Sequence, residues 1–420
     1  MQDRARPDRS CVSQCRSAQL ERPQPDIIHQ VPTTIVRFSA FAVAVSACSG
    51  SPAGDNVTRE QLPSGAERIT WHQLPPTPLA IDTVAVWHLW QEHRQHEFGD
   101  VRSVTGTPDG FYLLDGVNQQ IVRVNRQGIP VRVFGRRGAG PGEFQAALHL
   151  FARGDEVWVA DMGLGRYTVF DADGTFLQTV PWGGPGPINA DGFAITTAAQ
   201  LFSRWSIRGL WVLSRLSLDR SSVDTLAVMT TLPRAEAVVD LPGIGPTTMY
   251  DPPAFTPGLH WAWAGDDRIF TVTSAEYRVE ERDLSGRVRR ALVGPTPDLT
   301  VTGTDRHAFV AQFARLYGVD EESLRQRNPA LEDQYPFAER RAAVEAIRVD
   351  PLGRLWVLAN TVGENRTRLD LFDSDLAFVG SVTGLPQPEA FTGDGDALFR
   401  IAGGGEDGLD LFLVLRVNAP

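Results

Sequence analysis

The sequence of 420 residues contains no lysine, so all 40 of its cationic side chains are arginines. The absence of lysine excludes a P-loop lysine on a phosphate and any catalysis through a lysine Schiff base. Cations are also outnumbered, because the formal net charge is −11. This balance argues against a general nucleic-acid binder, which needs a surplus of cations facing phosphates.

Cysteine is scarce, with Cys11, Cys15 and Cys48 as its three occurrences. The long globular part after Cys48 therefore has neither a disulfide framework nor a cysteine-ligated metal site. Cys11 and Cys15 lie in a polar tail without partner ligands, and we interpret their spacing as chance. The sequence also lacks a GxSxG elbow, an HExxH motif and a cysteine–histidine pairing, so no standard hydrolase signature is present.

A short apolar run, FSAFAVAVSA (Phe38–Ala47), follows Arg37 and ends at Cys48. About ten apolar residues are too few to span a bilayer, but they suit the apolar core of a signal peptide. The ending Val45–Cys48 resembles a bacterial lipobox, which implies lipidation of Cys48 and a position in the periplasm or at the cell surface. By the same resemblance, Ser49 favours the outer membrane. The alternative is a short buried strand whose cysteine has no special role.

Three regions follow from this reading of the sequence. Residues 1–47 are predicted to be an N-terminal extension plus lipoprotein signal peptide, and residues 48–70 a flexible tether of small and polar residues. Residues 71–420 are predicted to be globular. The first 35 residues are long and polar for a signal peptide, so we expect translation to start at or near Val36.

Short apolar strands recur along the globular region. Their segments are GFYLLD (Gly110–Asp115), EVWVAD (Glu156–Asp161), GLWVLS (Gly209–Ser214), RIFTVT (Arg268–Thr273), RLWVLA (Arg354–Ala359) and ALFRIA (Ala397–Ala402). Several are followed by a second, alternating strand and then a third, as in QIVRVNRQG (Gln120–Gly128) and PVRVFG (Pro130–Gly135). Each unit is thus predicted to be a small antiparallel meander with one strand buried on both faces.

Such meanders cannot bury their faces alone, and stacking them around a ring solves that problem. The pattern predicts an all-β, six-bladed β-propeller of four-stranded antiparallel blades. An early strand, LAIDTVAVWHLW (Leu79–Trp90), is expected to complete the last blade and close the ring. One clear helical stretch begins at Asp305, and a helical insertion over about residues 305–345 is predicted to cap one end of the ring. The alternative role for this insertion is a substrate lid.

The segment FGRRGAGPGEF (Phe134–Phe144) connects two units and suggests a family. A strand, a D/N-rich turn, this glycine-rich segment and then EVWVAD follow one another along the chain. This order resembles that of NHL-repeat six-bladed propellers of the bacterial secreted or lipoprotein type. The match is sharpest over residues 98–180. PWGGPGP (Pro181–Pro187) occupies the same place one unit later, so the glycines are predicted to build a blade connector rather than a phosphate cradle. Phe134 and Phe144 are expected to anchor its ends.

The resemblance leaves two classes of function open, because propellers host both binding proteins and enzymes. The first is a ligand-binding or protein-interaction module, and the second a metal-dependent lactonase or lyase with its site in the central channel. The second would use residues such as Asp115, Asp161 and Asn360, at corresponding strand ends. We favour turn caps for these residues, and therefore binding over catalysis.

Cation sites and histidines are the next candidates. DADG (Asp171–Gly174), DSD (Asp373–Asp375) and GDGD (Gly393–Asp396) supply oxygen atoms, but none has the ligand series of a specific calcium loop. No cofactor is therefore expected, with a divalent cation such as calcium as the alternative. The sequence WHLWQEHRQHEF contains three histidines at no recognised metal-binding spacing: His88, His93 and His96.

Five residues are candidates for binding a protein, peptide or carbohydrate ligand: Arg136, Arg137, Trp182, Trp261 and Trp263. The two arginines would lie at the rim of the ring, and the three tryptophans near blade junctions, where aromatic rings could stack on a ligand. Three other tryptophans occupy similar places in the repeats and are predicted to be core residues: Trp158, Trp211 and Trp356.

Overall fold

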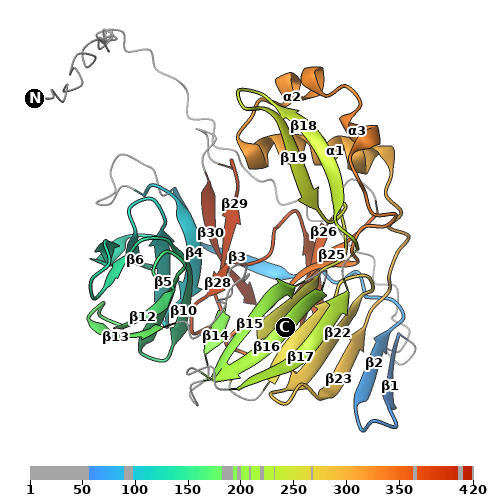
Figure 1. The fold of residues 1–420 in the computed structure, drawn as a ribbon. Coiled ribbons are helices and arrows are strands. Elements are labelled where there is room, and N and C mark those ends of the chain that lie inside the picture. Colours follow the sequence, from blue (N-terminus) through green and yellow to red (C-terminus); the bar gives the residue numbers. More distant parts are fainter. Residues whose placement is uncertain are drawn as a thin grey trace, which may run out of the picture. The chain divides into compact units, whose positions relative to one another are not determined.

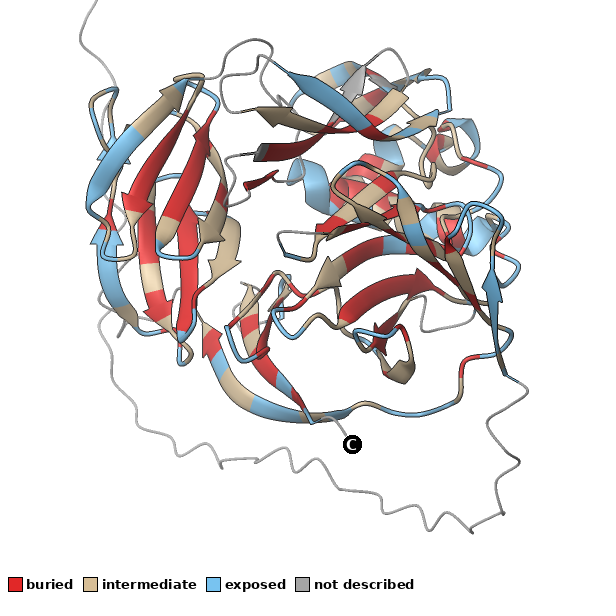
Figure 2. Ribbon diagram, turned by 90° about the horizontal axis from the view of Figure 1, so that it is seen from below, coloured by how far each residue is buried: buried red, intermediate tan, exposed pale blue. Residues whose placement is uncertain are grey.

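Six sheets of four blade strands each surround a common axis, which is the arrangement of a six-bladed β-propeller (Figures 1 and 2). The computed structural model describes residues 56–88, 98–181, 193–195, 200–207, 210–217, 222–230, 232–265, 268–362, 367–404 and 410–418. The predicted signal peptide, Cys11, Cys15 and Cys48 lie outside the described residues. The predicted all-β fold is confirmed.

The first three blades follow one another along the chain, each from an inner strand to an outer one. Blade 1 contains β4 (Val101–Gly106), β5 (Gly110–Asp115), β6 (Gln120–Asn125) and β7 (Pro130–Phe134). Blade 2 contains β10 (Ala147–Arg153), β11 (Glu156–Asp161), β12 (Arg166–Asp171) and β13 (Phe176–Pro181). Blade 3 contains β14 (Phe193–Ile195), β15 (Gln200–Ile207), β16 (Leu210–Ser217) and β17 (Val223–Thr230).

The last three blades use the C-terminal half of the chain together with one early strand. Blade 4 contains β20 (Leu259–Trp263), β21 (Arg268–Thr273), β22 (Arg278–Asp283) and β23 (Val288–Val293). Blade 5 contains β24 (Val344–Val349), β25 (Leu355–Asn360), β26 (Thr367–Phe372) and β27 (Phe378–Thr383). Blade 6 contains β28 (Ala390–Phe391), β29 (Ala397–Ile401), β30 (Leu411–Asn418) and the early strand β3 (Ala80–His88).

Burial follows the predicted pattern across most blades. Every residue of β5 and β25 is buried, because both faces of these second strands pack against neighbouring blades. The outermost strand β7 instead exposes Val131 and Val133. In Figure 2 the buried residues accordingly concentrate in the middle of the blades.

Blade 3 departs from the predicted repeat. The other five recurrent apolar segments lie in the second strand of their sheets, whereas Leu210–Ser214 lies in β16, the third strand of its sheet. The second strand is β15, whose sequence QLFSRWSI contains the buried Arg204. Because this charged residue interrupts the apolar residues of the core strand, the strand is not recognised by a pattern of continuous apolar residues.

Ring closure is as predicted, because β3 pairs antiparallel with β30 from Ala80↔Asn418 to His88↔Leu411. Trp87 on β3 is fully buried and stacks on Phe412 of β30, with ring centroids 5.3 Å apart. The early strand is therefore an integral part of the last blade.

The tether predicted over residues 48–70 is wrong for its second half. Strands β1 (Val57–Gln61) and β2 (Glu67–Trp71) form a hairpin, and β2 pairs in parallel with β23 at the outer edge of blade 4. The chain then crosses the outside of blade 5, where Ser381 exchanges backbone hydrogen bonds with Thr77 and Leu79. We call residues 57–88 the outer belt, because they contact blades 4, 5 and 6 in turn.

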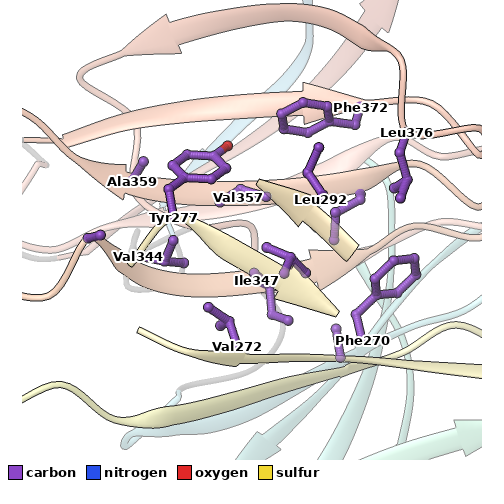
Figure 3. Packing of buried hydrophobic residues seen from close by; sticks show 14 of the residues in the cluster. Phe270, Val272, Tyr277, Leu292, Val344, Ile347, Val357, Ala359, Phe372 and Leu376 are labelled. Carbon is purple, nitrogen blue, oxygen red and sulfur yellow. The ribbon is translucent and has the colours of Figure 1, made fainter. Parts of the chain in front are cut away.

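Six hydrophobic clusters, one at each blade boundary, form the core. Between blades 4 and 5, Phe270 and Leu292 face Val357 and Phe372 across the boundary (Figure 3). Burial of apolar surface between neighbouring blades therefore stabilises the whole ring rather than any single sheet.

The helical insertion contains α1 (Gly303–Tyr317), α2 (Glu321–Arg327) and α3 (Leu331–Gln334), between β23 and β24. Thr302 and Asp305 form a capping box at the start of α1, and Asp320 caps α2 as the acidic sequence there predicts. The helices pack on a hairpin of β18 (Ala235–Leu241) and β19 (Gly245–Asp251) from another blade connector (Figure 1).

The helical spacing of Phe309, Phe313 and Leu316 predicts one apolar face of α1, and the structure departs from it at Leu316. Phe313 is buried against the hairpin, whereas Leu316 is 77% exposed. Both connectors join the outer strand of one blade to the inner strand of the next, so the insertion caps the end of the ring where inner strands begin.

Candidate functional site

A cavity of about 890 Å³ lies in the central channel. Its wall contains residues of the innermost strands of all six blades: β4, β10, β14, β20, β24 and β28. Turn residues after those strands, such as Gly154, Gly265 and Gly353, also line it. The cavity therefore extends toward the end of the ring opposite the helical insertion, none of whose residues is in the wall.

Closure of the ring is what brings these residues together. Neighbouring residues of an inner strand point to opposite faces, and the edge of that strand faces the axis. Backbone amides of β10 are fixed by hydroxyls of β4, with Leu150 N–H donating to Ser103 Oγ at 3.0 Å and Ala152 N–H to Thr105 Oγ1 at 3.3 Å. Inner strands of adjacent blades are thus held in register around the cavity.

Arginines dominate the charged part of the wall. Arg102 pairs with Asp100 at 3.1 Å, Arg268 pairs with Glu281 at 3.4 Å, and Arg153 pairs with Glu156. Glu389 is also in the wall, and it forms an ion pair with Arg400, with 3.0 Å between Glu389 Oε1 and Arg400 Nε. These pairs neutralise most of the charge that the wall carries.

Arg348, on β24, is the exception among the described arginines of the wall. Its Nη1 donates to the carbonyl of Ile347 at 3.0 Å, and no described carboxylate lies within ion-pairing distance. Burial lowers the pKa of the guanidinium, and the carboxylate of Glu389 opposes that change. Arg348 thus presents a largely uncompensated positive charge to the cavity.

His260 and Arg204 form the polar surroundings of the inner strand β20. Arg204 Nη1 donates to the carbonyl of Leu259, and its guanidinium lies 4.2 Å from the ring centroid of Trp211. Burial lowers the pKa of Arg204 to about 10. Burial, together with the charges of Arg204 and Arg348, lowers the pKa of His260 to about 4, so this imidazole is neutral at pH 7.

The structure places two of the five predicted ligand residues in the cavity wall. Trp261 and Trp263 both line the cavity from β20, and Trp263 packs on Phe202 of blade 3 at 5.0 Å between ring centroids. Trp182 lies outside the described residues. The tryptophan pair therefore offers aromatic surface to the channel while contributing to the boundary of blades 3 and 4.

Arg136 and Arg137 lie elsewhere, in the connector between blades 1 and 2. Arg136 Nε donates to Glu143 at 2.7 Å, and Arg137 Nη2 donates to the carbonyl of Val117 at 2.7 Å. Residues 136–137 also pair in parallel with residues 143–144. The connector precedes an inner strand, so it lies at the opposite end of the ring from the turns that line the cavity.

The connector is anchored as the sequence predicts. Phe144 is fully buried, Phe134 is 8% exposed, and both belong to the cluster between blades 1 and 2. Gly135 has φ of 75°, a conformation in which glycine avoids the strain of a side chain.

The residues predicted for a channel metal have another task. Asp161 accepts four backbone N–H groups, from Gln145, Ala146, Gly163 and Leu164, at 2.9–3.2 Å. Asp115 accepts backbone N–H groups of Gly99, Val117 and Asn118 in the same way. Asn360 donates to the carbonyl of Ala342 at 2.8 Å. These side chains join a turn to the preceding blade connector, as the turn-cap interpretation expects.

The acidic turns are likewise occupied by protein groups. Asp171 and Asp373 each accept backbone N–H groups two and four residues later. Asp396 forms ion pairs with Arg126 and Arg416, at nitrogen–oxygen distances of 3.0 and 2.6 Å. Within the described ranges, no group of three or more His, Cys, Asp or Glu side chains is placed to hold a metal ion.

The remaining predictions concern aromatic and imidazole side chains. Trp158 and Trp356 are buried core residues of second strands, as predicted. Trp211 lies instead on a third strand and is only partly buried, because blade 3 has a different register. His88 ends β3, whereas His93 and His96 fall outside the described residues.

Sequence reasoning missed Arg348, Arg204 and His260. A signal was present, since each is a polar residue in a strand next to apolar core positions. Their convergence depends on the order and register of separate blades, which periodicity does not define. In the described part of the chain, no helix has the length and apolar character needed to cross a membrane.

Comparison with solved structures shows similarity at low sequence identity. A protein from Bacteroides fragilis predicted to be exported has 11% identity and a TM-score of 0.47, covering 84% of this chain and 99% of its own. A member of the DUF4221 family from Bacteroides vulgatus has 9% identity and a TM-score of 0.47, covering 82% and 100%. Virginiamycin B lyase from Staphylococcus aureus has 11% identity and a TM-score of 0.40, covering 81% and 100%. No family model matches the chain, and no curated protein resembles it in sequence.

Proposed function

We propose that this chain is a ligand-binding protein of the bacterial cell envelope, with its ligand held in the central cavity. The observation that carries the proposal is the cavity of about 890 Å³, whose wall combines aromatic side chains with a few charged groups. Its size and mixed lining are those of small-molecule sites. The repeat pattern and the connector FGRRGAGPGEF support kinship with NHL-type propellers.

Binding is favoured over a metal-dependent lactonase or lyase reaction by the roles of the polar residues. A channel metal needs three or more protein ligands in one place. The strand-end residues that would supply them, such as Asp115 and Asp161, already accept several backbone N–H groups. Their oxygen atoms therefore stabilise turns rather than point together into the cavity.

Export and anchoring are part of the same proposal. The apolar run before Cys48 and the small residues around it support cleavage and lipidation at this cysteine. Expression in a lipoprotein-processing bacterium should place the protein in the detergent phase after Triton X-114 partition. Cys48→Ser should move it to the aqueous phase. Equal partition of both proteins, or recovery of peptides from residues 1–35 in the mature protein, would contradict lipidation.

Ligand binding is tested by dialysing the purified protein against a small-molecule extract of native cells, followed by mass spectrometry. Wild-type protein should enrich at least one compound. Ala152→Trp places a large side chain in the cavity wall and should abolish enrichment, whereas Val131→Trp on the exposed outer face should not. Thermal melting verifies that both variants fold. Absence of enrichment, or equal enrichment by Ala152→Trp, would refute the proposal.

A further inference from the structure

The charges of the cavity wall do not balance locally. Four described arginines line the cavity, and Arg102, Arg153 and Arg268 each have an ion-pair partner. Arg348 makes a single hydrogen bond, to the backbone carbonyl of Ile347. A guanidinium has five N–H donors in a rigid fork, so most of the donors of Arg348 remain available to a ligand.

Glu389, the carboxylate whose charge acts on Arg348, already forms an ion pair with another arginine. Glu389 lowers the cost of burying Arg348, but it forms an ion pair with Arg400, whose Nε lies 3.0 Å from Oε1 and whose Nη2 donates to Oε2 at 3.3 Å. Arg400 in turn lies 3.9 Å from Asp410, which is not in the cavity wall. The wall around Arg348 therefore keeps a positive charge that Glu389 does not neutralise.

Gln387 and His260 bear on the character of the ligand at this place. Gln387 lines the cavity, and its buried Oε1 has no hydrogen-bond partner among the described groups, so this oxygen can accept a hydrogen bond from an O–H or N–H group of a ligand. On the neighbouring inner strand β20, the charges of Arg204 and Arg348 help to lower the pKa of His260, so among the described residues no anion compensates their effect on this imidazole. A positive field inside a low-dielectric wall attracts anions strongly.

We propose that the cavity ligand is a small organic anion whose carboxylate or phosphate group is bound by Arg348, while Gln387 Oε1 accepts a hydrogen bond from an O–H or N–H group of the same molecule. Trp261 and Trp263 would contact the apolar or ring-shaped body of the same molecule. This inference rests on the proposed binding function and adds its ligand class. The positive cavity is notable in a protein of net charge −11, whose overall field repels anions.

Matched pairs of probes test the charge requirement. Binding of benzoate and of phenyl phosphate is compared with that of neutral benzamide by calorimetry at pH 7, with displacement by competing anion. Wild-type protein should bind at least one anion, about tenfold or more tightly than benzamide, because charge-assisted hydrogen bonds to an arginine contribute strongly. If neither anion binds better than benzamide, the proposal is refuted.

Variants assign the effect to one side chain. Arg348→Gln should remove the preference for the anion, whereas Arg348→Lys should retain part of it. Arg102→Gln changes an arginine of the same wall that already has a carboxylate partner, and should retain the preference. Melting temperatures without ligand show whether each variant is folded. An anion preference that survives in folded Arg348→Gln would overturn the assignment.

The two proposals fail in different ways. Enrichment of a neutral compound from the cell extract, together with no anion preference, would leave a binding protein and refute the anion site. An anion preference that depends on Arg348, without any enrichment from the extract, would support the site and refute the proposed function. Failure of both experiments would refute both proposals.

Discussion

The carboxylate of Asp161 shows how a residue typical of metal sites serves a turn. It is fully buried and accepts four backbone N–H groups. Asp161→Ala leaves those donors unpaired, so we expect the free energy of unfolding to fall by about 2–4 kcal/mol. Denaturant unfolding measures this loss. Calcium or EDTA should change neither protein, and stabilisation of the wild type alone by calcium would show that the carboxylate binds metal.

The imidazole of His260 gives a pH dependence with a defined sign. Its pKa falls from an ordinary 6.5 to about 4 in the folded protein, so the unfolded chain binds the extra proton between these values. The contribution of His260 to stability is therefore complete above pH 6.5 and is lost as the pH falls toward 4.

The variant His260→Asn keeps the carboxylates, which also make stability depend on pH, but removes the imidazole. Comparing the two proteins therefore isolates the pH dependence that comes from His260. Between about pH 7 and pH 4, the wild type should lose about 3 kcal/mol more free energy of unfolding than the variant. Urea unfolding at a series of pH values measures both proteins. Parallel pH profiles would mean that His260 is accessible to protons in the folded state.

Among the elements, the helical insertion has a hydrophobic core of its own with the hairpin β18–β19. Phe313→Ala removes a buried ring from that core and should destabilise the insertion by about 3–5 kcal/mol. Because this core is separate from the six clusters between blades, we expect faster proteolysis within residues 303–334 while the blades stay folded. Leu316→Ala, at an exposed position of the same helix, is the control. Simultaneous loss of all tertiary structure would show that the insertion and the ring unfold together.

Most elements were predictable because their periodicity is local. The second strands β5 and β11 read as continuous apolar segments, and the start of α2 carries its own acidic cap. The register of blade 3 was not predictable, because Arg204 interrupts its second strand, and the contacts that stabilise its burial, with Trp211 and the carbonyl of Leu259, come from other strands. Likewise, the hairpin β1–β2 has the polar composition of a tether, and it is ordered by pairing with β23 about 220 residues away.

At the scale of the whole molecule, closure of the ring depends on β3. A chain without residues 1–72 loses β1 and β2 but keeps β3, so it should remain a folded monomer with a lower melting temperature. A chain without residues 1–97 also loses Trp87, which is fully buried against Phe412, and leaves the edge of β30 unpaired. We expect this second chain to aggregate, because unpaired edges recruit other strands. Size-exclusion chromatography and thermal melting distinguish the two, and a monomeric, cooperative second chain would contradict the role of β3.

The outer belt also constrains the order in which the protein can fold. Arg59 donates to the carbonyl of Asp375, and Asn418 donates to Asp82, so the belt contacts residues more than 300 positions later in the chain. While the chain is being made, β2 lacks its partner β23 and β3 lacks its partner β30 until those later strands emerge. Contacts this distant form slowly, because a large loop must close first. The start of the globular region is therefore among its last parts to fold, and it remains open to chaperones and proteases until the C-terminal strand arrives.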